Sequence, residues 1–229
     1  RGMQVAVRNA NDGISLAQTA EGAFVNAADA LQRMRELAVQ ARNATNSDSD
    51  KDALDAEFGQ LASEVQRIFT GTTFNGKTIV GAQAGAQVFQ IGAGTAAADS
   101  ISITTTNMST QADITKVAGT DLAGAGRAVI DNTSTATTLG TVIDDIDKAL
   151  DTVNAERATY GAIQNRFDSV VKNLGTSIEQ STAARSRIMD ADFATETANL
   201  AKYQILQQAS ASMLAQSNQS SGLILKLLA

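Results

Sequence analysis

The chain lacks several residue types on which catalysis and metal binding depend. Its 229 residues include no cysteine, histidine, proline or tryptophan. Without cysteine and histidine, the chain can form no disulfide and has no thiol nucleophile. Ser-His-Asp hydrolases and zinc hydrolases with an H-E-x-x-H helix are also excluded. The absence of proline favours long, unbroken helices, because proline breaks helix interiors.

Charge and hydrophobicity argue against two further classes of function. The chain carries 18 Lys and Arg against 24 Asp and Glu, a net charge of −6. Since binding to phosphates requires clustered basic residues, we expect no nucleic-acid partner. No apolar run approaches the roughly 18 residues of a membrane span, and no secretory signal opens the chain. With only 7 Phe and 2 Tyr, the core must consist mainly of Ala, Leu, Ile and Val.

The first third has the pattern of an amphipathic helix. Residues 11–13, Asn-Asp-Gly, are a turn signal. After them, apolar residues recur at alternating spacings of three and four, which predicts a coiled-coil-like seam. The residues of this seam are Ala17, Ala20, Phe24, Ala27, Leu31, Met34, Ala38 and Ala41.

A second helix is expected after a polar loop at 43–49, with Ser47, Asp48 or Ser49 as its N-cap. Its predicted end lies near Gly71, and residues 74–77 predict a turn. The predicted apolar face of this helix comprises Leu54, Phe58, Leu61, Val65 and Ile68.

The middle of the chain, from about 81 to 138, is rich in Gly, Ala, Ser and Thr. Residues 88–91 and 100–104 predict two short strands joined by a glycine-rich turn. The turn contains G-x-G-x-x-A at 92–97, but a strand follows where a dinucleotide site requires a helix, so we interpret it as a turn. A helix around 122–129 is only weakly indicated.

The last third predicts a long helix from residue 139, with a second helical segment at 188–217. At 1.5 Å per residue, the first helix alone would be roughly 60–70 Å long, which predicts an elongated rod with the N-terminal helices as partners. We expect the middle segment at one end of this rod. Nine of twelve heptad positions are apolar. These positions are Ile143, Leu150, Arg157, Gln164, Val171 and Ile178, and Ile146, Val153, Tyr160, Phe167, Leu174 and Ser181.

The charged residues of the sequence do not match the pattern of a metal site or a catalytic site. Asp144, Asp145 and Asp147 lack the spacing of a calcium loop, as do Asp190 and Asp192, so we expect solvated carboxylates. The charges around Arg33 indicate local ion pairs on an exposed helix face. We therefore expect no catalytic residue, no cofactor and no metal site.

Several ordered blocks of the sequence resemble bacterial flagellin. They are RNANDGISLAQTAEG at 8–22, LQRMRELAVQ at 31–40, TFNGK at 73–77, GAIQNRF at 161–167, ARSRI at 184–188, DADFATE at 190–196 and QILQQA at 204–209. The resemblance implies a mainly α fold: an elongated rod of long coiled-coil-like helices with a small β-rich insertion. It also implies a non-enzymatic subunit of the bacterial flagellar filament, exported by the flagellar type III apparatus and located outside the cell.

The resemblance divides the chain into four parts. Residues 1–82 correspond to the N-terminal helical arm of the core rod, and 83–138 to a small variable β-rich insertion with a core hairpin. Residues 139–184 correspond to the long C-terminal helix of the rod, and 185–229 to an inner-tube helix. The family normally has a further segment before the position of Arg1, which pairs with 188–229. We expect this segment to be missing, the C-terminal helix to be detached, mobile or repacked, and assembly to be poor.

The partners implied by the resemblance are further copies of the chain, an export chaperone, and the cap and junction proteins. The expected assembly residues are Phe193, Leu200, Tyr203, Leu206 and Leu214. Arg33, Leu37 and Glu57, with Gln32 adjacent, match positions contacted by the vertebrate Toll-like flagellin receptor. Leu37 lies one turn after Arg33, which predicts that both occupy the same face.

Two alternative functions remain open from the sequence. One is a hook–filament junction protein, which shares the helical ends. The other is a flagellin-like cell-surface adhesin that binds a polysaccharide or a host receptor. An enzyme carried in the insertion is almost excluded, because the insertion is short and contains no histidine or cysteine.

Overall fold

The computed structural model describes residues 1–227, with side chains described except at 190–192 and 220–227. The chain divides into two compact units, Arg1–Gly175 and Thr176–Ala229. We describe each unit by itself. Both are built largely from helix, as the sequence predicts.

Helix α1 (Gly2–Ala41) is the first long element of unit 1. All eight predicted seam residues are buried in it, so the predicted apolar seam is confirmed. The turn predicted at 11–13 is wrong, because α1 continues through these residues without interruption. Gly13 serves a different purpose: a Cβ added there would lie 2.7 Å from a ring carbon of Phe167. The glycine therefore allows helix α4 (Ala136–Leu227), which carries Phe167, to approach α1 closely.

Helix α2 (Asp48–Gly71) begins and ends where the sequence predicts. Ser47 is its N-cap in a reciprocal capping box. The Asp50 amide donates to Ser47 Oγ at 3.2 Å, and the Ser47 amide donates to Asp50 Oδ2 at 2.9 Å. These bonds satisfy backbone donors that a helix start leaves unpaired. The buried residues of α2, which include Phe58, Val65 and Phe69, belong to the core of unit 1.

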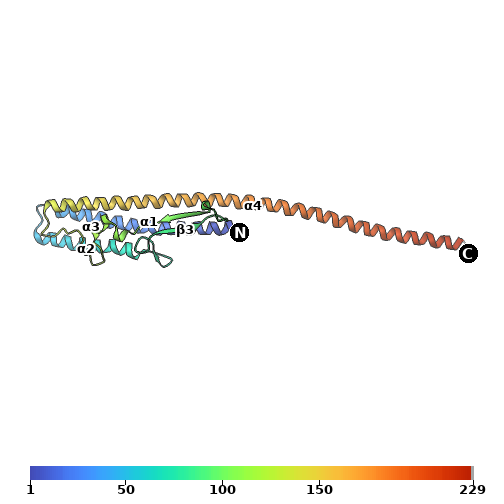
Figure 1. Ribbon diagram of the computed structural model, residues 1–229, viewed down its shortest axis with the longest axis horizontal. Helices are drawn as coiled ribbons and strands as arrows, with labels where there is room; N and C mark the ends of the chain where they lie inside the picture. Colours follow the sequence, from blue (N-terminus) through green and yellow to red (C-terminus); the bar gives the residue numbers. More distant parts are fainter. Residues whose placement is uncertain (228–229) are drawn as a thin grey trace. The chain divides into compact units, whose positions relative to one another are not determined.

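Helix α4 (Ala136–Leu227) is one continuous helix. The separate segment predicted to begin at 188 is therefore wrong. No proline, and no glycine between residues 175 and 222, is present to stop the helix. Up to Gly175, α4 lies beside α1 and α2 (Figure 1). One of its two predicted heptad registers is buried, through Ile146, Val153, Tyr160 and Phe167.

Two small antiparallel hairpins lie between α2 and α4 in sequence. Strands β1 (Thr73–Phe74) and β2 (Lys77–Thr78) form the first hairpin around the predicted turn. Strands β3 (Ala86–Gln90) and β4 (Ser100–Thr104) form the second, with Val88 opposite Ser102. The glycine-rich segment joins two strands and opens no α-helix, as predicted.

The rest of the middle segment contains the short helices η1 (Ala97–Asp99), η2 (Met108–Thr110) and α3 (Ala112–Ala118). The sequence did not predict α3, and the helix weakly indicated at 122–129 is absent, since turns occupy that segment.

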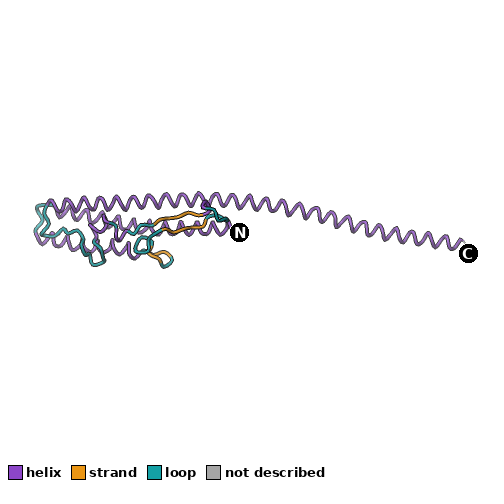
Figure 2. Tube along the Cα trace, in the orientation of Figure 1, coloured by secondary structure: helices purple, strands orange, loops and turns teal. Residues whose placement is uncertain are grey.

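The middle segment packs along the helices of unit 1 (Figure 2). Its buried residues Ile101, Ile103, Met108, Ile114 and Ile130 belong to the same core as α1 and α2. The expectation that this segment stands at one end of the rod is therefore wrong. The physical reason is that β4 and α3 each have an apolar face, which is buried by packing against the long helices.

Candidate functional site

Arg33 on α1 lies between two carboxylates and links α1 to α2. Its Nε donates to Glu57 Oε1 at 2.9 Å, and its Nη1 donates to Glu36 Oε2 at 2.9 Å. The Arg33 and Glu57 side chains are about half exposed, at 48% and 46%. We call Gln32, Arg33, Glu36 and Glu57 the Arg33 patch, because all four side chains are exposed on neighbouring helices. The structure thus brings together three of the four predicted receptor residues.

Leu37, the fourth predicted receptor residue, does not belong to this exposed patch. Its side chain is fully buried, at 0% exposure, and is part of the core of unit 1. The expectation that Leu37 shares an exposed face with Arg33 is corrected accordingly. Leu37 lies between the seam residues Met34 and Ala38 and is buried together with them, which removes its side chain from the surface.

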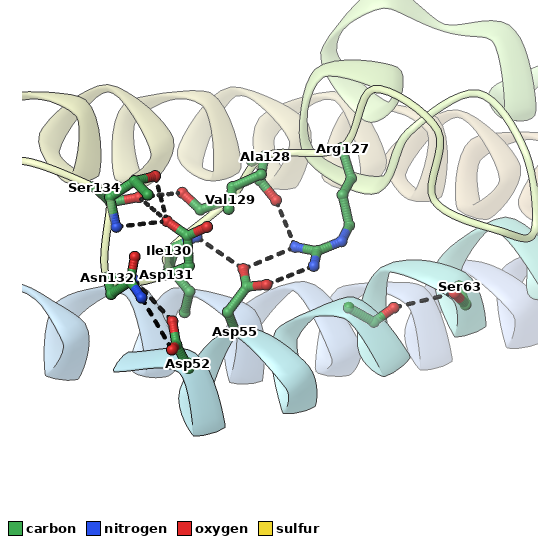
Figure 3. Close-up of polar contacts among 12 residues, drawn as sticks. Asp52, Asp55, Ser63, Arg127, Ala128, Val129, Ile130, Asp131, Asn132 and Ser134 are labelled. Atoms are coloured by element: carbon green, nitrogen blue, oxygen red, sulfur yellow. Dashed lines mark hydrogen bonds and ion pairs between the residues drawn. The ribbon is translucent and has the colours of Figure 1, made fainter. Parts of the chain in front are cut away.

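A second set of polar contacts holds the loop before α4 onto α2 (Figure 3). We call residues 127–134 the strap. Arg127 donates to both carboxylate oxygens of Asp55, at 2.9 and 2.6 Å, and the Ile130 amide donates to the same carboxylate at 2.9 Å. One turn earlier on α2, Asp52 accepts from the Asn132 backbone and side-chain amides, both at 3.1 Å. Two carboxylates of α2 therefore fix both ends of a short loop.

The ion pair between Asp55 and Arg127 is largely buried. The two side chains are 14% and 20% exposed, respectively, and the Arg127 guanidinium lies 6.0 Å from the ring centroid of Phe58. Burial raises the pKa of Asp55, but the hydrogen bonds from Arg127 and the Ile130 amide outweigh it, so the net pKa lies below the ordinary value. The carboxylate is therefore charged at neutral pH and stabilised by its partners.

Sequence reasoning missed the strap. One signal for it was present: Arg127 is the only basic residue between Lys116 and Lys148, in a segment rich in glycine and alanine. A lone guanidinium in such a segment predicts a carboxylate partner elsewhere, although the sequence does not show which one.

The helix of unit 2 carries large apolar side chains that are exposed to solvent. All five predicted assembly residues are among them: Phe193 at 74%, Leu200 at 55%, Tyr203 at 70%, Leu206 at 51% and Leu214 at 64% exposure. At about 100° per residue these five positions fall on one side of the helix. A face of this size is characteristic of an interaction surface.

Two of the acidic residues singled out in the sequence form ion pairs with basic side chains. Asp147 pairs with Arg35 at 2.7 Å, and Asp145 pairs with Lys148 at 3.0 Å. The side chains of Asp190 and Asp192 lie outside the described residues. Within the described side chains, no three Asp or Glu residues lie close enough together to hold a metal ion. Among residues 1–227, none of the helices has the length and apolar character needed to cross a membrane.

Comparison with known proteins places this architecture in one family. Residues 1–84 match the bacterial flagellin N-terminal helical region, and residues 143–228 match the bacterial flagellin C-terminal helical region. Flagellin of Halalkalibacterium halodurans is 40% identical over the whole chain, which spans 79% of that relative. Flagellin of Bacillus subtilis strain 168 is 38% identical over the whole chain, spanning 81% of that relative.

The fold comparison agrees with the sequence comparison. The crystal structure of Bacillus cereus flagellin superposes with a TM-score of 0.59 at 30% identity. The match covers 73% of this chain and 88% of that one. The relatives are named flagellins, which favours a filament subunit over the junction-protein and adhesin alternatives. The chain therefore belongs to the bacterial flagellin family: it is a structural, non-enzymatic subunit that polymerises into the extracellular flagellar filament.

Proposed function

We propose that the apolar face of the unit 2 helix is the surface through which this subunit polymerises. The observation that carries the proposal is the exposure of Phe193, Leu200, Tyr203, Leu206 and Leu214, each more than half exposed. Covering a leucine or phenylalanine side chain stabilises an interface by about 1.5–3 kcal/mol. Four side chains of the face are leucine or phenylalanine and the fifth is tyrosine, so covering the face with a helix of another copy stabilises the interface substantially.

Seeded filament growth tests this proposal with a matched pair of variants. Leu214→Asn places a polar side chain on the apolar face. Ser212→Asn places the same side chain about 200° around the helix, on the opposite side. We expect Leu214→Asn to raise the subunit concentration required for elongation roughly tenfold or more, and Ser212→Asn to leave it nearly unchanged. Equal effects of the two variants would contradict the proposal.

The expectation that a segment before residue 1 pairs with 188–229 stays a prediction. The same seeded assay tests it when this chain is compared with a form that carries such a segment. If only the longer form elongates filaments, the added segment is the assembly partner of the helix. If both forms elongate equally, the pairing is not required for growth.

We further propose that an export chaperone covers the same apolar face before assembly, and that the cap and junction proteins contact it at the filament ends. The support is physical, since a large exposed apolar surface on a free subunit promotes aggregation unless a partner covers it. A chaperone that binds this face must compete with filament seeds. Chaperone binding that survives Leu214→Asn unchanged would refute a shared surface.

A second proposal concerns the Arg33 patch as the contact surface for the vertebrate Toll-like flagellin receptor. Its support is the exposed guanidinium of Arg33, held by Glu36 and Glu57 in a fixed orientation suited to paired hydrogen bonds. Gln32 adds an exposed amide beside it. Leu37 supports the patch indirectly, because its packing in the core fixes the position of α1.

Receptor-driven signalling tests the second proposal. We expect Arg33→Ala to weaken signalling strongly while leaving the fold intact. Arg67→Ala is the control, because Arg67 is likewise exposed and pairs with Glu64 three residues earlier in its own helix. An Arg33→Ala protein that signals as strongly as the parent would remove the proposal.

A further inference from the structure

The tip of the first hairpin combines two chemical groups that react with each other. Asn75 and Gly76 form the two-residue turn between β1 and β2, with φ of 50° and 78°. Asn-Gly is the sequence that such a turn favours, because both residues adopt positive φ. This is the only asparagine in the chain that a glycine follows. Both residues are exposed, and a Cβ added at Gly76 would meet nothing within 4 Å.

Neither reacting group is engaged elsewhere. Within residues 1–227, the Asn75 side-chain amide and the Gly76 backbone N–H make no hydrogen bond. The absence of a side chain on Gly76 leaves its nitrogen unhindered. By contrast, the side-chain amide of Asn132 donates to Asp52, and the side-chain amide of Asn46 donates to the Gln40 carbonyl. Asn75 therefore differs from these asparagines in its following residue and in the freedom of its side chain.

We propose that Asn75–Gly76 is a site of spontaneous modification, at which the asparagine side chain loses ammonia. The Gly76 nitrogen gives its proton to water and attacks Asn75 Cγ. The new N–Cγ bond closes a succinimide ring, while the Cγ–Nδ2 bond breaks and the NH2 group takes up a proton from water and leaves as ammonia. Water then opens the ring at one of its two carbonyl carbons. The product is aspartate or isoaspartate, and either one adds a negative charge to the chain.

Opening of the hairpin controls the rate of this reaction. Positive φ holds the paired turn in one conformation, whereas ring closure requires the backbone around Asn75 to rotate. The hairpin has only two residues in each strand, and such a short pairing is marginally stable. Thr78 and Gln83 form a reciprocal clip beside it. The Thr78 amide donates to Gln83 Oε1 at 3.0 Å, and the Gln83 amide donates to Thr78 Oγ1 at 3.1 Å.

The two products have different structural consequences. Aspartate preserves the backbone, and Asp-Gly also suits this turn, so the hairpin keeps its pairing. Isoaspartate inserts an extra carbon into the backbone and breaks the pairing of Phe74 with Lys77. Local opening should then extend toward Thr73 and Thr78, but not into the buried residues Ile79 and Val80.

Incubation of the full chain at mildly alkaline pH, followed by peptide mass spectrometry, tests the proposal. We expect the peptide containing Asn75 to acquire the mass of the acid, with part of the product recognised by an isoaspartate-specific methyltransferase. Asn132 in the same sample is the internal control and should stay unmodified. The variant Gln83→Ala removes the side-chain half of the clip and should speed conversion of Asn75 roughly 5-fold.

Two results would overturn the proposal. One is an intact Asn75 amide in the folded chain under conditions that fully convert a free peptide of residues 71–80. The other is conversion of Asn132 at the same rate as Asn75. An unchanged rate in Gln83→Ala would refute control by hairpin opening.

Discussion

Removal of the Asp55 carboxylate is expected to destabilise unit 1 more than loss of any exposed ion pair. Asp55→Ala leaves the Arg127 guanidinium and the Ile130 amide without their acceptor. Breaking a fully buried ion pair costs about 3–5 kcal/mol, and breaking an exposed one about 0–1 kcal/mol. Because Asp55 is 14% and Arg127 20% exposed, we expect about 2–3 kcal/mol of lost stability.

Equilibrium unfolding in urea, followed by circular dichroism, measures this loss. Glu64→Ala is the matched control, because Glu64 pairs with Arg67 on the surface of the same helix, and it should cost less than about 1 kcal/mol. The double variant Asp55→Ala/Arg127→Met removes both charges and keeps an apolar stem near Phe58. It should recover part of the loss, since no charge is left buried and unpaired. A cost of Asp55→Ala no larger than that of Glu64→Ala would refute the reasoning.

The same ion pair makes a pH-dependent contribution to stability. The pKa of Asp55 is lower in the folded chain than its ordinary value of 3.8. The charged form is therefore favoured by folding, and its contribution is fully present above the ordinary pKa. It is lost as the pH falls below 3.8 through the folded pKa. Asp55→Asn should weaken this acid dependence, and an unchanged dependence would contradict the assignment.

Two further predictions concern the core of unit 1. Gly13→Ala should cost about 1–3 kcal/mol despite the better helix propensity of alanine, because its Cβ would meet the Phe167 ring at 2.7 Å. A Cβ added at Gly161 would meet nothing within 4 Å, so Gly161→Ala should instead stabilise α4 by about 0.5–1 kcal/mol. Unfolding curves in which both variants change the stability in the same direction would contradict this. Burial, with a smaller effect from Glu156, raises the pKa of Tyr160 far above its ordinary value of 10.0. The neutral Tyr160 side chain contributes to stability below pH 10, and this contribution is lost as the pH rises through the folded pKa. In a Tyr203→Phe variant Tyr160 is the sole tyrosine, so the phenolate absorbance should appear only together with loss of helical circular dichroism.

Much of the helical fold could be predicted because the spacing of apolar residues along the sequence determines which face of each helix is buried. The seam of α1, the Ser47 cap and one buried register of α4 follow from local patterns that the tertiary structure preserves. The prediction of a turn at Asn11–Gly13 was wrong because glycine can either favour a turn or give room for close packing inside a helix. Here the missing side chain admits the Phe167 ring, which no local pattern shows.

The features of the candidate site were less predictable than the helices. Arg33 and Glu57 were matched as receptor positions by resemblance alone. Helical spacing placed Leu37 beside Arg33 but did not show its burial, which depends on which residues of α1 face the core. The strap depends on the pairing of Asp55 with Arg127, 72 residues apart in sequence. Pairing over such a distance is set by the packing of the whole unit, and a single sequence does not contain it.

We propose above that the apolar face of the unit 2 helix drives polymerisation. Electron microscopy of seeded filament growth, with Leu214→Asn and Ser212→Asn compared at equal concentration, tests it most directly. We expect long filaments from the parent and from Ser212→Asn, and bare seeds from Leu214→Asn. Filaments of equal length from both variants would contradict it and would place the assembly surface elsewhere on the subunit.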